Sequence, residues 1–170
     1  MPTPRSTAAS PVAIPVASPG PHAFGVRQEL PVPASALPHR TPRELITLAR
    51  RGLEEAVEAR TDGLRYATAH LAALRAAAAV LAARATAAPG RRGRLTSVWT
   101  LLVMVAPELR EWAAYFAAGA NKRAAAEAGI PRVVSPREAE DLLRSAEQFI
   151  GVVEVTLGLS YQPLLEGLAS

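Results

Sequence analysis

Residues 135–158 of the chain read SPREAEDLLRSAEQFIGVVEVTLG, and this stretch carries the start, the body and the end of one helix signal. Ser135-Pro136-Arg137-Glu138 is a capping box, because the serine hydroxyl can accept from the third amide while the glutamate reaches back to the serine amide. Gly158 suits the left-handed residue that ends many helices. Between these ends, apolar residues recur at steps of three and four, which predicts a helix with one buried face. That face consists of Ala139, Leu142, Leu143, Ala146, Phe149, Ile150, Val153 and Leu157.

A second capping box, Thr41-Pro42-Arg43-Glu44, predicts another helix start. The residues that follow separate into an apolar side and a charged side, so this helix should also pack with one face. The apolar side consists of Leu45, Ile46, Ala49, Leu53, Ala56 and Val57, and the charged side of Arg50, Arg51, Glu54, Glu55 and Glu58. Arg50, Glu54 and Glu58 follow one another at intervals of four residues, which favours an exposed ion-pair lattice.

Helical spacing continues from Leu64 to Leu81 and predicts a helix that stops before Ala88-Pro89-Gly90. Its alanine run, residues 76–79, permits close approach by neighbouring helices. Its expected inward residues are Leu64, Ala67, Leu71, Leu74, Ala78 and Leu81.

A third helix is expected after Thr96 or Ser97, and Pro107 should kink or break it before a fourth begins. The fourth helix should turn inward the residues Leu109, Trp112, Ala113, Phe116 and Ala120. Together these signals predict an all-α fold, an antiparallel up-and-down bundle of four long helices plus one short helix.

The chain divides near residue 40. Residues 1–40 hold nine of the fifteen prolines and almost no charge, so we predict a disordered tail rich in proline, alanine and serine. The predicted domains are this tail, a helical bundle at 41–158 and a C-terminal tail at 159–170. Proline or serine repeatedly interrupts the apolar residues of the first tail, which argues against a signal peptide.

The composition limits the classes of function. The chain contains no cysteine, which excludes a disulfide framework and a thiolate metal site and favours a cytoplasmic location. The formal net charge is +4, but 18 of the 19 basic residues are arginines, a bias typical of GC-rich coding, so the charge is weak evidence for a polyanionic partner. The longest uncharged apolar run, SVWTLLVMVA at 97–106, has about half of the roughly 20 residues needed to span a bilayer, so no membrane segment is expected.

Arg65 and His70 frame the stretch RYATAH, whose spacing matches the sparse signature of one class of helical ribonuclease. A helix turns by about 100° per residue, so the two side chains should point about 140° apart. Arg65 is then expected on the solvated side and His70 at the margin of the core, out of hydrogen-bond reach of each other within one chain. We interpret His70 as a half-buried packing residue and Arg65 as solvated, with an active pair formed across a dimer as the alternative.

A basic stretch at residues 90–94, GRRGR, precedes the helix start at Thr96 and Ser97. Arg91, Arg92 and Arg94, together with the free amides of that helix start, could hold a phosphate. A solvated loop between helices is the favoured interpretation, because the stretch lacks the ending of a P-loop.

Arg123 falls on the apolar stripe of Trp112 and Phe116, where it either extends off the end of the face or projects into a pocket or partner. No metal site or cofactor is expected. His70 is the only histidine outside the first tail, and the Glu-x-x-His pattern of di-metal bundles is absent.

Three long stretches carry a family resemblance: TPRELITLARRGLEEAVEARTDGLRYATAHLAALRAAAAVLAARA at 41–85, SVWTLLVMVAPELREWAAYFAAGANKRAAAEAGI at 97–130 and SPREAEDLLRSAEQFIGVVE at 135–154. They resemble an uncharacterised actinobacterial family of HEPN-domain proteins, the higher eukaryotes and prokaryotes nucleotide-binding superfamily. The resemblance covers Thr41 to about Gly158. It implies a four- to five-helix bundle, frequent homodimers, and members that are either RNA-cleaving toxins or non-catalytic binders of nucleotides, RNA or proteins.

In the catalytic members of that superfamily, the arginine and histidine lie near the start of the last long helix and meet their copies across a dimer interface. Here the last helix, Pro136 to Leu157, has no histidine, and RYATAH lies in the second helix, where Tyr66 and Ala67 would serve packing. The resemblance therefore transfers no nuclease residue to this chain.

We predict a non-catalytic HEPN-type helical module that binds nucleotide, RNA or a protein partner and acts as a cytoplasmic homodimer. One alternative is a toxin-type ribonuclease that uses Arg65 and His70 across a dimer interface. The other is a structural adaptor whose proline-rich tail docks a partner.

Overall fold

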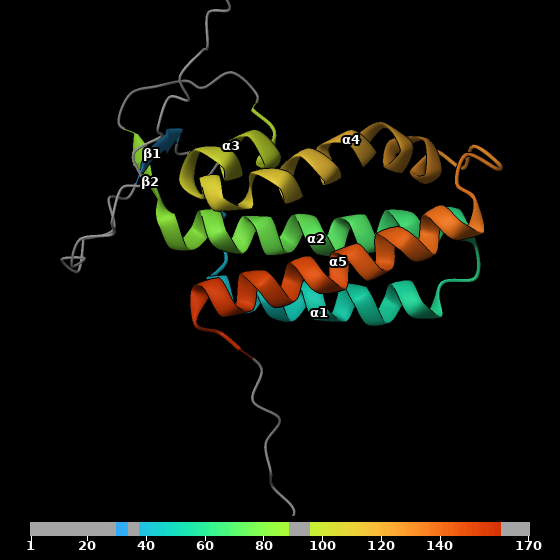
Figure 1. Ribbon diagram of the computed structural model, residues 1–170, viewed down its shortest axis with the longest axis horizontal. Helices are drawn as coiled ribbons and strands as arrows, with labels where there is room; N and C mark the ends of the chain where they lie inside the picture. The colour runs from blue at the N-terminus through green and yellow to red at the C-terminus, as the bar shows by residue number, and fades with distance from the viewer. Residues whose placement is uncertain (1–29, 34–37, 89–95, 161–170) are drawn as a thin grey trace, which may run out of the picture.

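The computed structural model describes residues 30–33, 38–88 and 96–160, which form a helical bundle (Figure 1). The elements follow in the order β1 (Leu30–Pro33), α1 (Pro42–Glu58), α2 (Asp62–Arg84), β2 (Ala85–Ala88), α3 (Val98–Val105), the 3₁₀ turn η2 (Pro107–Leu109), α4 (Arg110–Glu127) and α5 (Pro136–Leu157). The prediction of an all-α bundle with four long helices and one short helix is confirmed.

α2 is the central helix, because α1, α3, α4 and α5 all pack against it (Figure 1). Its small side chains suit this position, since they let neighbouring backbones approach closely. Two of the neighbouring helices carry a glycine where they come close to α2. A Cβ added at Gly52 of α1 would lie 3.1 Å from the Ala72 Cβ, and one added at Gly119 of α4 would lie 2.6 Å from the Tyr66 Oη. The buried alanines of α2 are Ala67, Ala69, Ala72, Ala73, Ala76, Ala77 and Ala79.

The helix ends lie where the sequence predicts them. Thr41 and Ser135 each form both halves of a capping box, and Ser97 caps α3. Pro107 begins η2, which separates α3 from α4. Gly158 ends α5 with φ 65°, in the left-handed region that glycine adopts without strain.

The predicted inward face of α2 is confirmed at Ala67 and Leu81, which are buried, and wrong at its other four residues. Leu64 is 54% exposed, and Leu71, Leu74 and Ala78 are only half-buried. Because α2 has neighbours on most of its sides, its buried residues do not follow a single stripe. Val57 of α1, which was also expected to point inward, is 58% exposed.

The two short strands form a parallel pair at the end of the bundle, in the register Leu30 with Ala85 and Pro33 with Ala88. β1 belongs to the segment that the composition assigns to the N-terminal tail. Strands of four residues are too short for a readable alternation, and pairing between distant segments leaves no local pattern. The other parts of the predicted tails, 1–29, 34–37 and 161–170, lie outside the described residues.

Within the described part of the chain, α2 is the one helix that is long and apolar enough to cross a membrane. However, 61% of its apolar window is buried inside the bundle, as expected for the core helix of a soluble protein. The central position of α2 therefore accounts for its composition, and the absence of a membrane segment stays a prediction.

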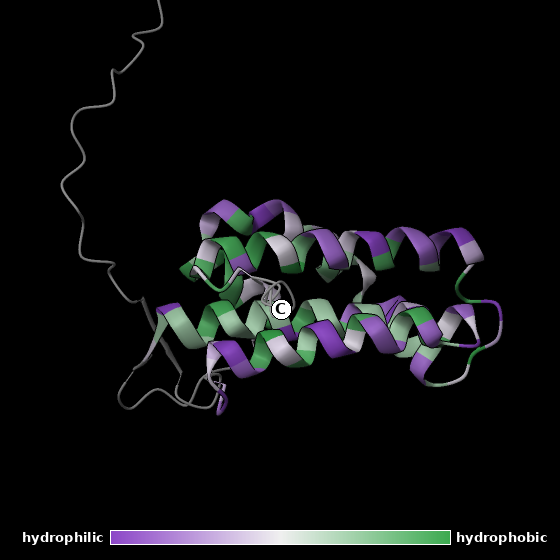
Figure 2. Cartoon of the chain, turned by 90° about the horizontal axis from the view of Figure 1, so that it is seen from below, coloured by the Kyte–Doolittle hydropathy of each residue, from purple (hydrophilic) through white to green (hydrophobic). Residues whose placement is uncertain are grey.

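Aromatic rings from α3, α4 and α5 fill the core beside α2. Phe116 and Phe149 are fully buried, with ring centroids 5.3 Å apart, and Trp99 stacks on Phe116 at 5.2 Å. In Figure 2, hydrophobic residues lie on the sides of the helices that face other helices, and hydrophilic residues lie on their outer sides. The residues that the sequence places at the centre of the α5 stripe, Phe149 and Ile150, have no exposed surface, so that facing is confirmed.

Phe149→Ala is expected to lower the free energy of unfolding by about 3 to 5 kcal/mol, because it leaves a cavity among packed rings. Arg144→Ala, on the outer side of the same helix, should change it by no more than about 0.5 kcal/mol. Urea denaturation midpoints of the two variants measure the difference. Equal midpoints would contradict the facing of α5.

Candidate functional site

His70 lies in the core and not at its margin, so the prediction of a half-buried position is wrong. Its side chain has no exposed surface and packs edge-on against Trp99 and Phe116, with ring centroids 5.8 Å away in both cases. The Nε2 atom lies 2.7 Å from the backbone carbonyl oxygen of Phe116 in α4. Since a carbonyl can only accept, Nε2 carries the proton and donates this hydrogen bond. His70 thus fastens α2 to α4.

The surroundings of His70 favour its neutral form. Burial lowers the pKa of His70, and the positive charge of Arg123 lowers it further, against the opposing effects of the Phe116 carbonyl and Glu127. A general base has to exchange its proton with a reacting group. The proton of His70 is instead held between two packed helices, away from any described groove.

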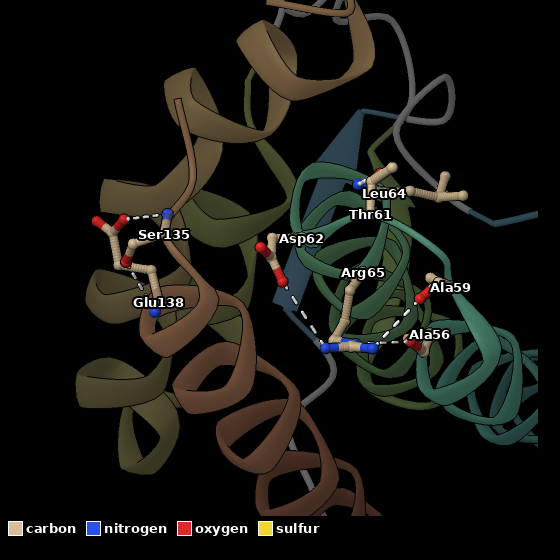
Figure 3. A network of polar contacts seen from close by, with 8 residues as sticks. All are labelled: Ala56, Ala59, Thr61, Asp62, Leu64, Arg65, Ser135 and Glu138. Carbon is tan, nitrogen blue, oxygen red and sulfur yellow. Dashed lines mark hydrogen bonds and ion pairs between the residues drawn. The ribbon is translucent and has the colours of Figure 1, made fainter. Parts of the chain in front are cut away.

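Arg65 is only partly solvated, in contrast to the prediction of a fully solvated side chain. Its side chain is 28% exposed and lies across the end of α1 (Figure 3). The Nε atom donates to the Ala56 carbonyl at 3.4 Å, and Nη2 donates to the Ala59 carbonyl at 3.2 Å. Asp62 lies 3.8 Å from Nη1. Because the last carbonyls of a helix lack partners within the helix, Arg65 serves as a side-chain cap for α1.

Arg65 and His70 therefore contact different parts of the bundle, Arg65 the end of α1 and His70 the middle of α4. This agrees with the divergence expected from their helical spacing. Within one chain the two side chains do not face a common cavity. A catalytic pair across a dimer would need both side chains to leave their present partners.

The other predicted binding residues do not form a site in the described part of the chain. Arg91, Arg92 and Arg94 lie outside the described residues. Arg123 is 24% exposed, and its Nε atom lies 3.6 Å from the Glu127 carboxylate one helical turn away. Its charged end thus turns toward a neighbour on its own helix, close to His70.

A hollow lies between α1 and the C-terminal end of α5 with the residues that follow it, and we name it the α1–α5 groove. It has a volume of about 1090 Å³ and opens to solvent. α1 and α5 both pack on α2 and run antiparallel (Figure 1). Its lining consists of Arg43, Ile46, Thr47, Arg50, Arg51, Glu54, Glu154, Gly158, Leu159 and Ser160.

An ion pair between Arg50 and Glu154 spans the groove. The Nε of Arg50 donates to one carboxylate oxygen of Glu154 at 2.8 Å, and Nη2 donates to the other at 2.5 Å. The Glu154 side chain is 7% exposed and that of Arg50 is 38% exposed. The hydrogen bond to Glu154 raises the pKa of Arg50, which stays charged. The pair fixes the plane of the guanidinium, and within residues 30–33, 38–88 and 96–160 no hydrogen bond uses its Nη1 atom, which can therefore bind a ligand.

Arg50 thus pairs across helices instead of with Glu54, so the lattice predicted along α1 is wrong at this position. Glu154 could not be found from local spacing. It lies on the flank of the buried α5 stripe, and its partner is 104 residues away in the sequence. The clustering of Arg43, Arg50 and Arg51 at seven- and eight-residue spacing on one helix was the available signal for the groove.

A family model described as SAV_6107-like HEPN matches residues 56–154, which is more than half of the 170-residue chain. The match covers the end of α1, α2 to α4, and α5 as far as Glu154. It includes Glu154 but begins after Arg43, Arg50 and Arg51. No curated protein and no solved structure matches the chain.

Arg65→Ala should lower the free energy of unfolding by about 1 kcal/mol, because the carbonyls at the end of α1 lose their side-chain donor. Arg60→Ala is the matched control, since Arg60 is exposed in the connection between α1 and α2, and it should change stability by at most about 0.5 kcal/mol. Chemical denaturation of both variants tests the cap. A loss no larger for Arg65 than for Arg60 would show that the two hydrogen bonds contribute nothing.

His70 should make the protein less stable in mild acid. The pKa of folded His70 is lowered, so below about pH 6.5 the unfolded chain takes up a proton that the folded chain does not. Stability should therefore fall as the pH falls from about 7 toward 5, by at most about 1.4 kcal/mol per pH unit from this residue.

His70→Gln keeps a donor for the Phe116 carbonyl and removes the titration. Urea midpoints of wild type and variant at several pH values should converge as the pH falls, because only the wild type loses the contribution of His70. Parallel profiles would rule out a lowered pKa for His70.

Proposed function

Since the chain belongs to the SAV_6107-like HEPN family, we propose that it is a non-catalytic HEPN-type module that binds its ligand in the α1–α5 groove. The position of His70 carries the first half of this proposal. The imidazole is the one histidine side chain of the helical bundle, and it donates from Nε2 to a buried backbone carbonyl. A ribonuclease needs a base and a cation in one accessible cleft. Here the imidazole has no exposed surface and Arg65 caps another helix.

The arginines of the groove support the second half of the proposal. Of the ligand classes that the family resemblance implies, nucleotides and RNA carry phosphate, which arginine recognises through several donors at once. A protein partner has no comparable support in the groove. A homodimer and a cytoplasmic location remain proposals that rest on the resemblance and on the composition.

Purified wild type, Arg65→Ala and His70→Gln are compared on structured and single-stranded RNA without added metal. The expected result is that none of the three cleaves RNA above the background of a mock purification. A known ribonuclease serves as the positive control for the substrates. Cleavage by the wild type that disappears in both variants, at unchanged melting temperature, would establish the ribonuclease alternative and overturn the proposal.

A further inference from the structure

The charge of the α1–α5 groove reverses along its length. Arg43 lines one end, and Arg50 and Arg51 follow about two helical turns further along α1, ahead of Glu54. Arg50 is paired with Glu154, whereas Arg43 and Arg51 form no ion pair within the described part of the chain. We call the part of the groove at Arg43, Arg50 and Arg51 the basic end.

A second, smaller hollow of about 250 Å³ continues the groove toward the C-terminus of α1. It shares Arg50 and Glu54 with the larger hollow and adds Glu147 from α5. The rest of its lining is apolar and consists of Leu53, Val57 and Leu143. We call this hollow the acidic end.

The length of the groove selects between small and extended ligands. From Arg43 to Val57, α1 advances by fourteen residues, or about 21 Å, and from Arg50 to Val57 by about 10 Å. An RNA strand that followed the groove would carry phosphates along its whole length. At the acidic end these would meet the carboxylates of Glu54 and Glu147, and like charges repel.

A small phosphate ester meets no such conflict. Its phosphate can bind the exposed arginines and the Nη1 atom of Arg50, whose guanidinium Glu154 holds in a fixed plane. The rest of the molecule then lies over Leu53, Val57 and Leu143, with amino or hydroxyl groups donating to Glu54 and Glu147. The two hollows, of about 1090 and 250 Å³, lie just above and just below the range of about 300 to 1,000 Å³ that is typical of pockets for small molecules.

We infer that the α1–α5 groove binds a small ligand with a phosphate at one end and hydrogen-bond donors at the other, such as a nucleoside monophosphate, and not an RNA strand. This inference rests on the proposed function and specifies its ligand. It makes Arg43, Arg50 and Arg51 the phosphate contacts and Glu54 and Glu147 the acceptors for the far end.

The test compares four probes by isothermal titration: adenosine 5′-monophosphate, adenosine, inorganic phosphate and a single-stranded RNA of about 20 nucleotides. Adenosine 5′-monophosphate should bind at least tenfold more tightly than adenosine or phosphate alone. The double variant Arg43→Glu with Arg51→Glu should weaken that binding more than tenfold.

Arg60→Glu with Arg137→Glu is the matched control for the double variant. It changes the net charge equally, and Arg137 follows the first proline of α5 as Arg43 follows that of α1, yet neither control residue lines the groove. The control should bind adenosine 5′-monophosphate within about twofold of wild type. Melting curves of both double variants show that they are folded.

A further variant tests the charge reversal itself. Glu54→Arg with Glu147→Arg makes the whole groove basic, so it should bind the RNA at least tenfold more tightly than wild type and adenosine 5′-monophosphate no more tightly.

The outcomes separate the ligand from the proposed function. Wild-type binding of RNA that exceeds binding of adenosine 5′-monophosphate and is lost in the groove variant would overturn the inference and leave a non-catalytic RNA-binding module. Equal binding of adenosine 5′-monophosphate by wild type and groove variant, or no binding of it at millimolar concentration, would also overturn the inference. The cleavage assay decides independently whether the module is non-catalytic.

Discussion

The close packing of four helices around the alanine-rich α2 is the constraint on which the rest of the structure depends. Alanine side chains bring little apolar area into the core, so stability has to come from close contact of backbones and from the aromatic rings of the surrounding helices. Close contact also leaves little room for water between the helices. A polar side chain on α2 must then find a partner in a neighbouring helix, and His70 finds the carbonyl of Phe116. Gly119, one turn further along α4, leaves the space that the rings of Tyr66 and His70 occupy.

Much of the fold could be predicted from sequence because the ends of its helices are set by residues that are close together in the chain. The capping boxes at Thr41 and Ser135 and the glycine after α5 each act within a few residues, and the stripe of α5 has a single inner side. The facing of α2 could not be predicted in the same way. Periodicity reports a boundary between core and solvent, and a helix with neighbours on most sides has hardly any such boundary. Arg65 illustrates the consequence: the side opposite to the leucines faces the end of α1 and not water.

The candidate site could be predicted only in part for a related reason. The ribonuclease-like spacing of RYATAH is local and easily seen, but its two residues are held by different helices. The groove joins side chains that are far apart in the sequence, and its decisive pair, Arg50 with Glu154, leaves no spacing to recognise. A helical pattern in α1 explained Arg50 equally well as a partner of Glu54. Only the antiparallel placement of α1 and α5 on α2 decides between the two partners.

Glu154 connects the stability of the bundle to the shape of the groove. Its carboxylate is almost fully buried, and such a charge is stable only while a cation faces it. Arg50 supplies that cation, and the pair in turn fixes the orientation of its guanidinium in the lining of the groove, where the Arg50 side chain is 38% exposed. The exposed arginines, in contrast, have no structural partner among the described residues, so they can change without disturbing the core. Ligand recognition in the groove therefore depends on one donor that the fold holds in place, Arg50, and on exposed arginines that can vary, Arg43 and Arg51. A change at Glu154 would alter both the packing of α1 on α5 and the orientation of the central donor.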